Sequence, residues 1–358
     1  MYTDLTKLCV GQRISILDAI NRMDASALGI VLVVDDERRL VGTITDGDVR
    51  RAMLANMDFE QPVSVLLARK ADSRFSRPIA APVGADRSTY LSLLQKHSIM
   101  HLPLVDESGR VAGLIKLDDF VPDRMLSLQA VVMAGGRGNR MRPLTEELPK
   151  PMLPIGDRPL MEIIIGQLRD AGIKRVNVAT HHKSEKITNH FGDGSNFGVE
   201  IAYVTEDRPL GTAGALGLMN SPEETILVIN GDILTQVDFR SMVAFHREQR
   251  ADLTMAVRQY DLQVPYGVVE SKGPSVQRLR EKPCLNFLVN AGIYLLEPLV
   301  HRFIPNGESF DMTDLIQRLL DEGRNVVSFP IREYWLDIGL PDDYHQAQKD
   351  AKGWKGES

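Results

Sequence analysis

The sequence predicts an α/β protein in which a mostly parallel sheet is preceded by a smaller α+β module. From about residue 126 onward, apolar segments of strand length alternate with amphipathic helical segments, which is typical of a parallel sheet with helices on both faces. The first third contains an internal repeat instead, and the two patterns meet near residues 122–127. The 358 residues leave room for two domains, which we expect at 1–123 and 127–352.

The internal repeat relates two copies that lie 71 positions apart. Corresponding positions are Asp35 and Asp106, Gly42 and Gly113, and Asp48 and Asp119. Each copy is expected to form a helix, a strand, a turn, a strand and a helix, because runs of Val, Ile and Leu flank polar turn residues. The copies cover about residues 1–57 and 76–123. The stretch 58–82 is polar and contains proline, and its structure stays open at this point.

In the second part, the expected strands are 130–134, 175–180, 200–204, 226–230, 253–258, 287–295 and 326–329. The expected helices are 160–171, 242–249 and 312–321. Strands that alternate with helices in this way form parallel sheets, and such sheets bind their ligands at the carboxyl ends of the strands.

Composition narrows the class of protein. Hydrophobic residues make up 43% and charged residues 25%, with a net charge of -6, so we expect neither a nucleic-acid partner nor a membrane partner. Cys9 and Cys284 are the only cysteines, which excludes a disulfide framework and a CxxC metal site. The sequence shows no signal-peptide pattern, and apolar runs such as residues 28–34 are too short to cross a bilayer. We expect a cytoplasmic protein.

A glycine-rich segment follows the first expected strand of the second part. Residues 134–145 read AGGRGNRMRPLT, and the proline-flanked Lys150 follows in LPKPMLP. Glycines let the backbone approach a phosphate closely, and Arg140, Arg142 and Lys150 add positive charge beside it. The segment lacks the GxxxxGK[ST] of a Walker-type loop, and Met141 stands where a dinucleotide motif has its third glycine. We therefore expect a phosphate site of another kind.

The glycine-rich segment and its continuation resemble the signature of sugar-phosphate nucleotidyltransferases. This family includes glucose-1-phosphate thymidylyltransferase and mannose-1-phosphate guanylyltransferase, and the resemblance covers about residues 127–350. It implies a Rossmann-like sheet and the conversion of a nucleoside triphosphate and a sugar 1-phosphate into a nucleotide sugar and pyrophosphate. It also implies that Arg140 and Lys150 stabilise the transferred phosphoryl group and the departing pyrophosphate. The implied nucleotide-binding positions in the loop are Ala134, Gly135, Gly136 and Gly138.

Two aspartates are candidates for a metal site. Asp232 ends an expected strand in Asn-Gly-Asp, and a hard carboxylate ligand at that edge of the sheet suits Mg²⁺ bound to a triphosphate. Asp337, in Trp-Leu-Asp-Ile-Gly, resembles the second metal aspartate of the family. Either aspartate alone would more often be a helix cap or a turn residue. Together, the two contexts imply Mg²⁺ as the cofactor.

The resemblance also assigns residues to the sugar 1-phosphate. Glu281-Lys282-Pro283 resembles the acceptor motif, in which Lys282 holds the phosphate and Glu281 a sugar hydroxyl. Asn290 would contact the sugar, and Gly267 would let the backbone approach it. A Glu-Lys pair by itself is more often an exposed surface pair, so this assignment rests on the order of the motifs.

Residues 206–214 resemble the loop that recognises the base. A carboxylate such as Glu206 can accept hydrogen bonds from the N1–H and the N2 amino group of guanine at once, which favours GTP. Gly211 and Thr212 are the further nucleotide-binding candidates. Use of UTP, CTP or dTTP by the same fold stays an alternative, as does an exposed Glu206 without a role. His181 and His182 fit no zinc pattern and receive no role.

The N-terminal repeat resembles paired CBS regulatory domains. In their adenosine-nucleotide motif, a Thr and an Asp three residues later contact phosphate and ribose, which implies Thr45 and Asp48. The second copy keeps Asp119 but has Lys116 at the hydroxyl position. The resemblance implies a regulatory nucleotide and a homo-oligomer, and a packing module without a ligand is the alternative.

Two other functions compete with the transferase. One is a nucleotide-sensing regulator whose transferase domain is degenerate, and the intact set of charged motif residues argues against it. The other is a glycosyltransferase, which usually carries Asp-x-Asp where this chain has Asn230-Gly231-Asp232. We expect the product to serve surface-glycan precursor synthesis, with mannose, glucosamine and heptose phosphates as candidate acceptors.

Overall fold

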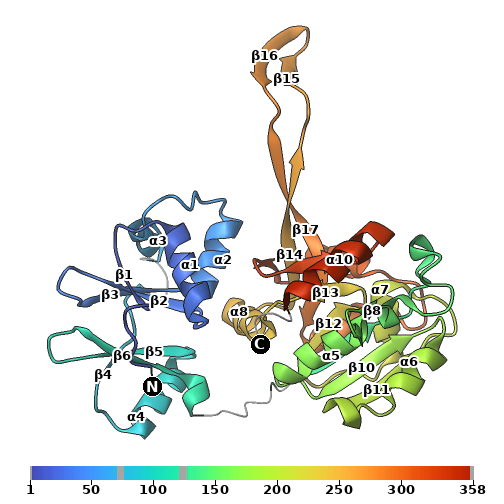
Figure 1. Ribbon diagram of the computed structural model, residues 1–358, viewed down its shortest axis with the longest axis horizontal. Coiled ribbons are helices and arrows are strands. Elements are labelled where there is room, and N and C mark those ends of the chain that lie inside the picture. Colours follow the sequence, from blue (N-terminus) through green and yellow to red (C-terminus); the bar gives the residue numbers. More distant parts are fainter. Residues whose placement is uncertain (1, 71–75, 121–125, 127, 355–358) are drawn as a thin grey trace. The chain divides into compact units, whose positions relative to one another are not determined.

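The computed structural model describes residues 2–70, 76–120, 126 and 128–354. The chain forms two compact units, Met1–Arg124 and Met125–Ser358, each with its own hydrophobic clusters (Figure 1). No helix within the described ranges is long and apolar enough to cross a membrane.

The N-terminal unit contains two small sheets of the same design. The first repeat comprises β1 (Cys9–Gly11), α1 (Ile16–Ser26), β2 (Ile30–Val34), β3 (Leu40–Thr45), α2 (Asp46–Leu54) and α3 (Val63–Arg69). The second comprises β4 (Ala81–Pro82), α4 (Arg87–His97), β5 (His101–Val105), β6 (Val111–Lys116) and η1 (Leu117–Asp119). Both sheets pair their first two strands in parallel and the last two antiparallel. The register shift also recurs, at Val33/Val34 and at Leu104/Val105.

Two details of this unit differ from the sequence prediction. Helix α3 lies in the stretch 58–82 that composition left open, and its Val63 and Leu66 are buried with α1 and β2. The second copy ends in the short 3₁₀ helix η1 where we expected a helix like α2. Helix α1 begins at Ile16 and helix α4 at Arg87, where Ser15 and Asp86 accept hydrogen bonds from the N–H groups of Asp18 and Thr89.

The C-terminal unit is built on a seven-stranded sheet of order β11-β10-β7-β12-β17-β14-β18. Its strands are β7 (Gln129–Met133), β10 (Arg175–Thr180), β11 (Glu200–Thr205), β12 (Ile226–Asn230), β14 (Leu253–Gln263), β17 (Cys284–Leu296) and β18 (Val326–Ile331). Strand β17 runs antiparallel to both of its neighbours, and the other pairings are parallel. The mixed, mostly parallel sheet confirms the predicted fold class.

Helices cover both faces of this sheet. One face packs against α5 (Leu160–Asp170), α6 (Ser184–Phe191), α8 (Phe239–Gln249) and α10 (Pro341–Trp354). The other packs against α7 (Gly211–Gly214), η5 (Ala215–Leu218), η6 (Pro298–Phe303) and α9 (Met312–Asp321). Neighbouring residues of a strand alternate between the two clusters: in β12, Leu227 and Ile229 join the first, and Ile226 and Val228 the second.

Short elements close the carboxyl edge of the sheet. They are η2 (Asn139–Met141), η3 (Lys150–Met152), β8 (Pro154–Ile155), β9 (Arg158–Pro159), β13 (Ile233–Thr235) and β19 (Trp335–Asp337), whereas η4 (Ser195–Phe197) precedes β11 at the amino edge. Strands β13 and β19 pair antiparallel, which brings chain segments about one hundred positions apart to the same place.

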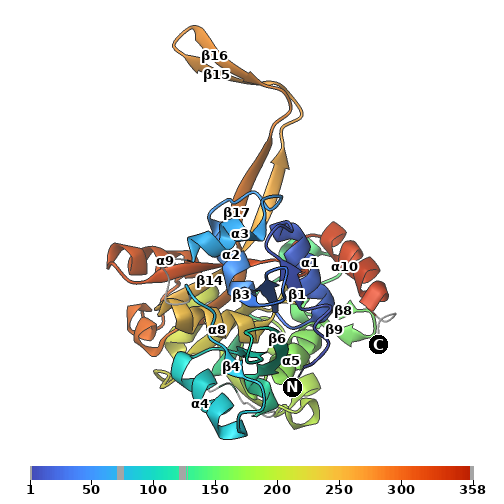
Figure 2. The same ribbon diagram turned by 90° about the vertical axis from the view of Figure 1, so that its left-hand side faces the viewer.

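A long hairpin arm projects from this unit. Strands β14 and β17 continue together beyond the sheet, and β15 (Val268–Lys272) and β16 (Ser275–Arg280) form its end (Figures 1 and 2). The sequence prediction ended the first of these strands at residue 258 and began the other at 287, so it missed the arm. The outer parts of both strands mix polar and apolar residues and lack the buried run that marks a core strand.

Candidate active site

The glycine-rich loop connects β7 to η2 at the carboxyl edge of the sheet. The N–H of Ala134 donates to the carbonyl of Ala179 in β10 at 2.8 Å, which fixes the start of the loop. Gly138 adopts a left-handed conformation, with φ of 62°, and its carbonyl accepts a 2.9 Å hydrogen bond from the Thr145 hydroxyl. A Cβ at position 138 would lie 2.9 Å from Cγ2 of Thr145. The loop therefore needs glycine at this turn.

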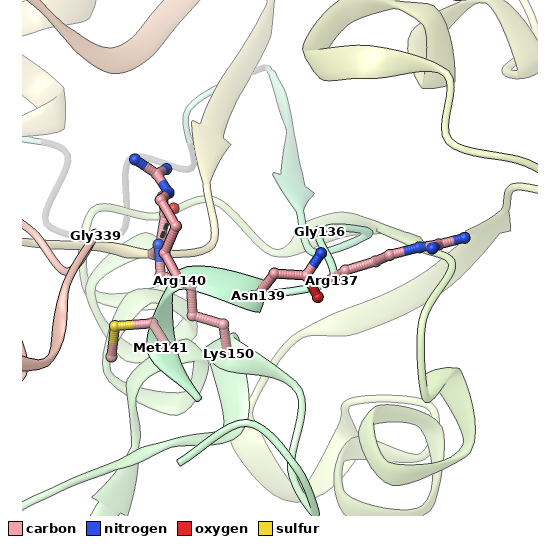
Figure 3. A pocket seen from close by; sticks show the side chains of 9 residues that line it. Gly136, Arg137, Asn139, Arg140, Met141, Lys150 and Gly339 are labelled. Atoms are coloured by element: carbon pink, nitrogen blue, oxygen red, sulfur yellow. Dashed lines mark hydrogen bonds and ion pairs between the residues drawn. The ribbon is translucent and has the colours of Figure 1, made fainter. Parts of the chain in front are cut away.

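A cavity of about 440 Å³ opens beside this loop (Figure 3). Four segments of the chain contribute to it: the loop with η2, the buried Lys150, Asp232 after β12, and Gly339 after β19. The lining residues are Gly136, Arg137, Gly138, Asn139, Arg140, Met141, Lys150, Asp232 and Gly339. Figure 3 shows the side chains of Arg140 and Arg137 leaving the loop in different directions. The cavity thus combines exposed glycine backbone with three cationic side chains, which suits a polyphosphate.

Lys150 joins the two predicted metal aspartates. Its ammonium group donates to Oδ2 of Asp232 at 2.5 Å and lies 4.0 Å from Oδ1 of Asp337. The aspartates meet because β13 pairs with β19, and the N–H of Ile338 donates to the Asp232 carbonyl at 3.0 Å. The structure therefore brings together Arg140, Lys150, Asp232 and, at the rim, Asp337, as the sequence predicted.

The surroundings of Asp337 disfavour an isolated negative charge. Burial and the neighbouring Asp232 carboxylate raise the pKa of Asp337, and Lys150 only partly offsets them. The carboxylates of Asp232 and Asp337 both lie near the Lys150 ammonium group. Such a pair fits Mg²⁺, which commonly takes one or two carboxylates and completes its shell with phosphate oxygens and water. Within the described residues, no group of three or more metal-ligating side chains occurs.

Glu206 lies against the glycine-rich loop. Its side chain is only 6% exposed, and Oε2 accepts a hydrogen bond from the Leu210 N–H at 2.9 Å. A Cβ at Gly135 would lie 2.5 Å from Oε1 of Glu206, so the buried Glu206 side chain leaves room only for glycine at position 135. Burial raises the pKa of the Glu206 carboxyl. The alternative of an exposed loop residue is therefore wrong.

His181 supports the same loop, a contact that the sequence did not reveal. Its Nδ1 lies 2.9 Å from the carbonyl of Glu206, and because a carbonyl only accepts, Nδ1 carries the proton. Further residues that we did not predict line the cavity, namely Arg137, Asn139, Met141 and Gly339. Three of these belong to the glycine-rich segment and Gly339 lies two positions after Asp337, so proximity to the motifs was the available signal.

Gly211 and Thr212 hold the start of α9. The Thr212 N–H donates to Oδ1 of Asp311 at 3.0 Å, and its hydroxyl accepts from the Met312 N–H at 2.8 Å. Gly211 has φ of 80°, and a Cβ there would lie 2.5 Å from Oδ1 of Asp311. Both residues thus join the loop after Glu206 to the N-terminal end of α9.

The predicted acceptor residues separate into two groups. Asn290 stands at the root of the arm, where it donates to the Tyr294 hydroxyl at 2.7 Å and accepts from the Gly292 N–H at 3.0 Å. Gly267, Glu281 and Lys282 lie farther out, in the arm. Lys282 lies in a bend with φ of 41°, just before strand β17 begins at Cys284. None of these three residues is among those that line the cavity.

In the N-terminal unit, Asp48 is held by its own neighbours. Its side chain is 1% exposed and accepts hydrogen bonds from Lys70 at 2.7 Å and Arg51 at 2.6 Å. Although burial opposes ionisation, Lys70 and Arg51 hold the pKa of Asp48 below its ordinary value. The hydroxyl of Thr45 donates to Asp48 at 3.0 Å. In the second copy, Asp119 accepts from the Lys116 N–H at 3.2 Å.

Sequence comparison gives the family of the larger unit. Residues 129–353 match the nucleotidyl transferase family. The chain belongs to this family. Residues 4–55, the first repeat, match the CBS domain, so this nucleotidyl transferase carries an N-terminal CBS domain as the sequence indicated.

Named relatives of this nucleotidyl transferase use different bases. A UTP–glucose-1-phosphate uridylyltransferase of Synechocystis sp. is 35% identical over 241 residues, which cover 62% of each chain. A mannose-1-phosphate guanylyltransferase of Mycobacterium tuberculosis is 34% identical, covering 62% of this chain and 64% of the relative. A D-glycero-α-D-manno-heptose 1-phosphate guanylyltransferase of Aneurinibacillus thermoaerophilus is 34% identical, covering 63% and 99%. The chain thus spans less than two thirds of the first two relatives.

Comparison of structures supports the fold. A Bacillus anthracis protein assigned as a glucose-1-phosphate thymidylyltransferase, solved in complex with sucrose, aligns with a TM-score of 0.53 at 24% identity. The alignment covers 63% of this chain and 96% of that chain. At this identity, the likeness concerns the fold of the nucleotidyl transferase unit alone.

Proposed function

We propose that the protein transfers a nucleoside monophosphate from a nucleoside triphosphate to a sugar 1-phosphate, releasing pyrophosphate. The observation that carries this proposal is the convergence of Lys150 and Asp232 beside the glycine-rich loop, with Arg140 on the same cavity wall. Its relatives named above are sugar-1-phosphate nucleotidyltransferases, which supports the same class of reaction.

In the proposed mechanism, the acceptor phosphate oxygen attacks the α-phosphorus in line and pyrophosphate leaves. No covalent intermediate is needed, so positioning and charge neutralisation supply the catalysis. Lys150 and Arg140 stabilise the negative charge on the α-phosphoryl group and on the departing pyrophosphate. Asp232 and Asp337 would hold Mg²⁺, which neutralises triphosphate charge when bound. Lys282 orients the attacking phosphate, and Glu281, Asn290 and Gly267 contact the sugar.

For the base, we propose GTP. The buried Glu206 presents a carboxylate beside the loop, and guanine offers two adjacent donors where uracil and thymine offer one. Two of the named relatives are guanylyltransferases and one is a uridylyltransferase, so a UDP-sugar product is the main alternative. Glu206→Gln should weaken the preference for GTP over UTP, because an amide has only one acceptor oxygen.

The decisive assay measures pyrophosphate release across a matrix of nucleoside triphosphates and sugar 1-phosphates. We expect turnover with GTP and a hexose or heptose 1-phosphate, and loss of turnover in EDTA. Equal or better use of UTP or dTTP would overturn the base assignment but not the reaction class. Absence of turnover with every pair, in a chain that still binds nucleotides, would favour the nucleotide-sensing alternative.

We also propose that the CBS domain binds a regulatory nucleotide near Thr45 and Asp48, with Asp119 in the second copy. The match to the CBS domain supports this proposal. Because Lys70 occupies the Asp48 carboxylate, a ribose hydroxyl has to displace that ammonium group. Calorimetry on the full chain with AMP, ATP and GTP tests it, and Lys70→Met should tighten binding. Failure of all three nucleotides to bind in both proteins would contradict the proposal.

A further inference from the structure

The turn after β10 holds a lysine in a backbone conformation that glycine usually adopts. Lys183 directly precedes α6, with φ of 54° and ψ of 39°. A residue other than glycine with positive φ is uncommon, and such residues gather at functional sites. The local backbone therefore does not explain why a lysine stands at this position, whereas the contacts of its side chain do.

The ammonium group of Lys183 binds the end of the glycine-rich segment. Its Nζ donates to the carbonyl of Thr145 at 3.0 Å and to the carbonyl of Glu146. Hydrogen bonds from an ionised donor are stronger than those between neutral groups. The lysine consequently ties the segment that follows η2 to the start of α6.

Thr145 extends this restraint to the turn at Gly138. Thr145 is only 4% exposed, and its hydroxyl donates to the Gly138 carbonyl at 2.9 Å. The same carbonyl accepts a hydrogen bond from the Met141 N–H at 2.9 Å. Met141 ends η2, the short helix that carries Arg140. Two hydrogen bonds thus connect Lys183 through Thr145 to the turn at which η2 begins.

Gly138 is also packed between Thr145 and the buried Lys150. A Cβ at position 138 would lie 2.9 Å from Cγ2 of Thr145 and 3.4 Å from Cβ of Lys150. Close-packed interiors transmit strain, so a displacement of Thr145 reaches this turn and the residues beside it.

We propose that Lys183 is a positioning residue, which holds the Gly138 turn and Arg140 in the arrangement that binds a triphosphate. Lys183 is not among the residues that line the cavity. Its effect on catalysis therefore passes through Thr145. Donors that are held in place before the substrate arrives need no rearrangement during the reaction, so such a support contributes to rate. This inference rests on the proposed function of the glycine-rich loop and Arg140.

Substitution of Lys183 in the full chain tests the proposal. Lys183→Met keeps the length of the side chain and removes its donors. We expect kcat/KM for the nucleoside triphosphate to fall on the order of 10²-fold, because small misplacements of binding groups have effects of this size. KM for the sugar 1-phosphate should stay unchanged, since the acceptor does not contact this loop. A rise of the same size in that KM would overturn the proposal.

Two further variants serve as controls for this measurement. Lys183→Arg keeps charged donors at the same position and should restore most of the lost activity. Lys186→Met removes an exposed lysine from the same helix and should behave as wild type. An equal loss in Lys186→Met would mean that the charge of α6 matters and not the contact with Thr145.

A double-mutant cycle separates action through the loop from direct attraction of the substrate. Burial, and then the positive charges of Lys183 and Arg137, lower the pKa of His182, so a polyphosphate beside these residues would also feel the Lys183 charge. Thr145→Val removes the hydroxyl that reaches Gly138 and keeps the shape of the side chain. In that background, Lys183→Met should cost much less than in the wild-type chain. Fully additive effects on kcat/KM would contradict the path through Thr145.

Hydrogen exchange examines the same path without any substrate. The amides of Met141 and Leu144 donate to the carbonyls of Gly138 and Met141, and their exchange reports on the turn. We expect both amides to exchange faster in Lys183→Met and in Thr145→Val, and at the wild-type rate in Lys186→Met. Unchanged exchange in Lys183→Met would refute the positioning role. Because this readout needs no turnover, it separates failure of this inference from failure of the proposed reaction.

Discussion

Lys150 and Asp232 lie 82 positions apart in the sequence, and yet the lysine ammonium donates to the aspartate at 2.5 Å. The Lys150 side chain is 11% exposed and that of Asp232 is 29% exposed, so the pair is partly buried. Removing one partner of such a pair leaves the other without its counter-charge, which costs stability as well as function. The pair therefore connects the glycine-rich side of the cavity to the β13–β19 side.

Asp232→Asn should reduce turnover on the order of 10²-fold or more, because it removes both a proposed Mg²⁺ ligand and the partner of Lys150. Steady-state pyrophosphate release measures the effect. Asp342→Asn removes the same charge from an exposed position nearby and should stay close to wild type. Unimpaired turnover of the Asp232→Asn protein would exclude this residue from the metal site.

Asp337→Asn should lose turnover and gain at most a small amount of thermal stability at pH 7 in the absence of Mg²⁺, because the side chain is 52% exposed and solvent screens its charge. Because burial and Asp232 raise the pKa of Asp337, the folded state holds this proton more tightly than the unfolded chain. The free energy of unfolding therefore falls as pH rises from the ordinary carboxyl range through the raised value, and asparagine avoids that loss. Calorimetric Tm values against pH provide the test. A lower Tm of the variant at pH 7 would contradict it.

Gly135→Ala and Gly136→Ala should behave differently. A Cβ at Gly135 would lie 2.5 Å from Glu206, whereas a Cβ at Gly136 meets nothing within 4 Å. We expect Gly135→Ala to lower the Tm of the substrate-free protein and to weaken discrimination between bases. Gly136→Ala should leave that Tm unchanged and raise KM for the nucleoside triphosphate, since the proposed phosphate contact with this backbone would meet the added methyl group. Equal Tm losses in both variants would contradict the different surroundings that we assign to Gly135 and Gly136.

Asp48→Asn should destabilise the N-terminal unit by about 3–5 kcal/mol, because Lys70 and Arg51 lose the buried charge between them. Since the pKa of Asp48 is lowered, the wild-type contribution is present above the ordinary carboxyl range and is lost as pH falls through the lowered value. Urea unfolding of the full chain at pH 7 measures the change. Asp36→Asn, at an exposed position, is the control, and an equal shift there would remove the special role of Asp48.

The strands buried on both sides could be predicted from the sequence because apolar runs ended at turn residues on each side. Strands β10 and β12 and helix α9 begin and end where expected. The arm could not be predicted in this way, since its outer strands lack a core and its apolar face is defined only by the pairing of β14 with β17.

For the candidate site, local motifs predicted Lys150, Asp232 and Asp337, since each stands beside glycine, proline or a strand end. Contacts between distant segments were out of reach. The bond from His181 to Glu206, the bracket between Thr212 and Asp311, and the pairing of Lys70 with Asp48 each depend on packing between elements. Sequence spacing carries no signal for such partners. Glu206, Thr212 and Asp48, which the sequence analysis assigned to nucleotide binding, therefore also make structural contacts that it did not predict.

The unbroken ladder of the arm constrains how the protein can evolve. Loss of one residue from each outer strand would move Tyr260 and Phe287 to the opposite side of the ribbon, because side chains alternate with a period of two. Loss of two residues per strand would shorten the arm by about 7 Å and keep its orientation. Homologues with arms of different length should therefore differ by even numbers of residues in each strand, which an alignment of natural sequences can examine.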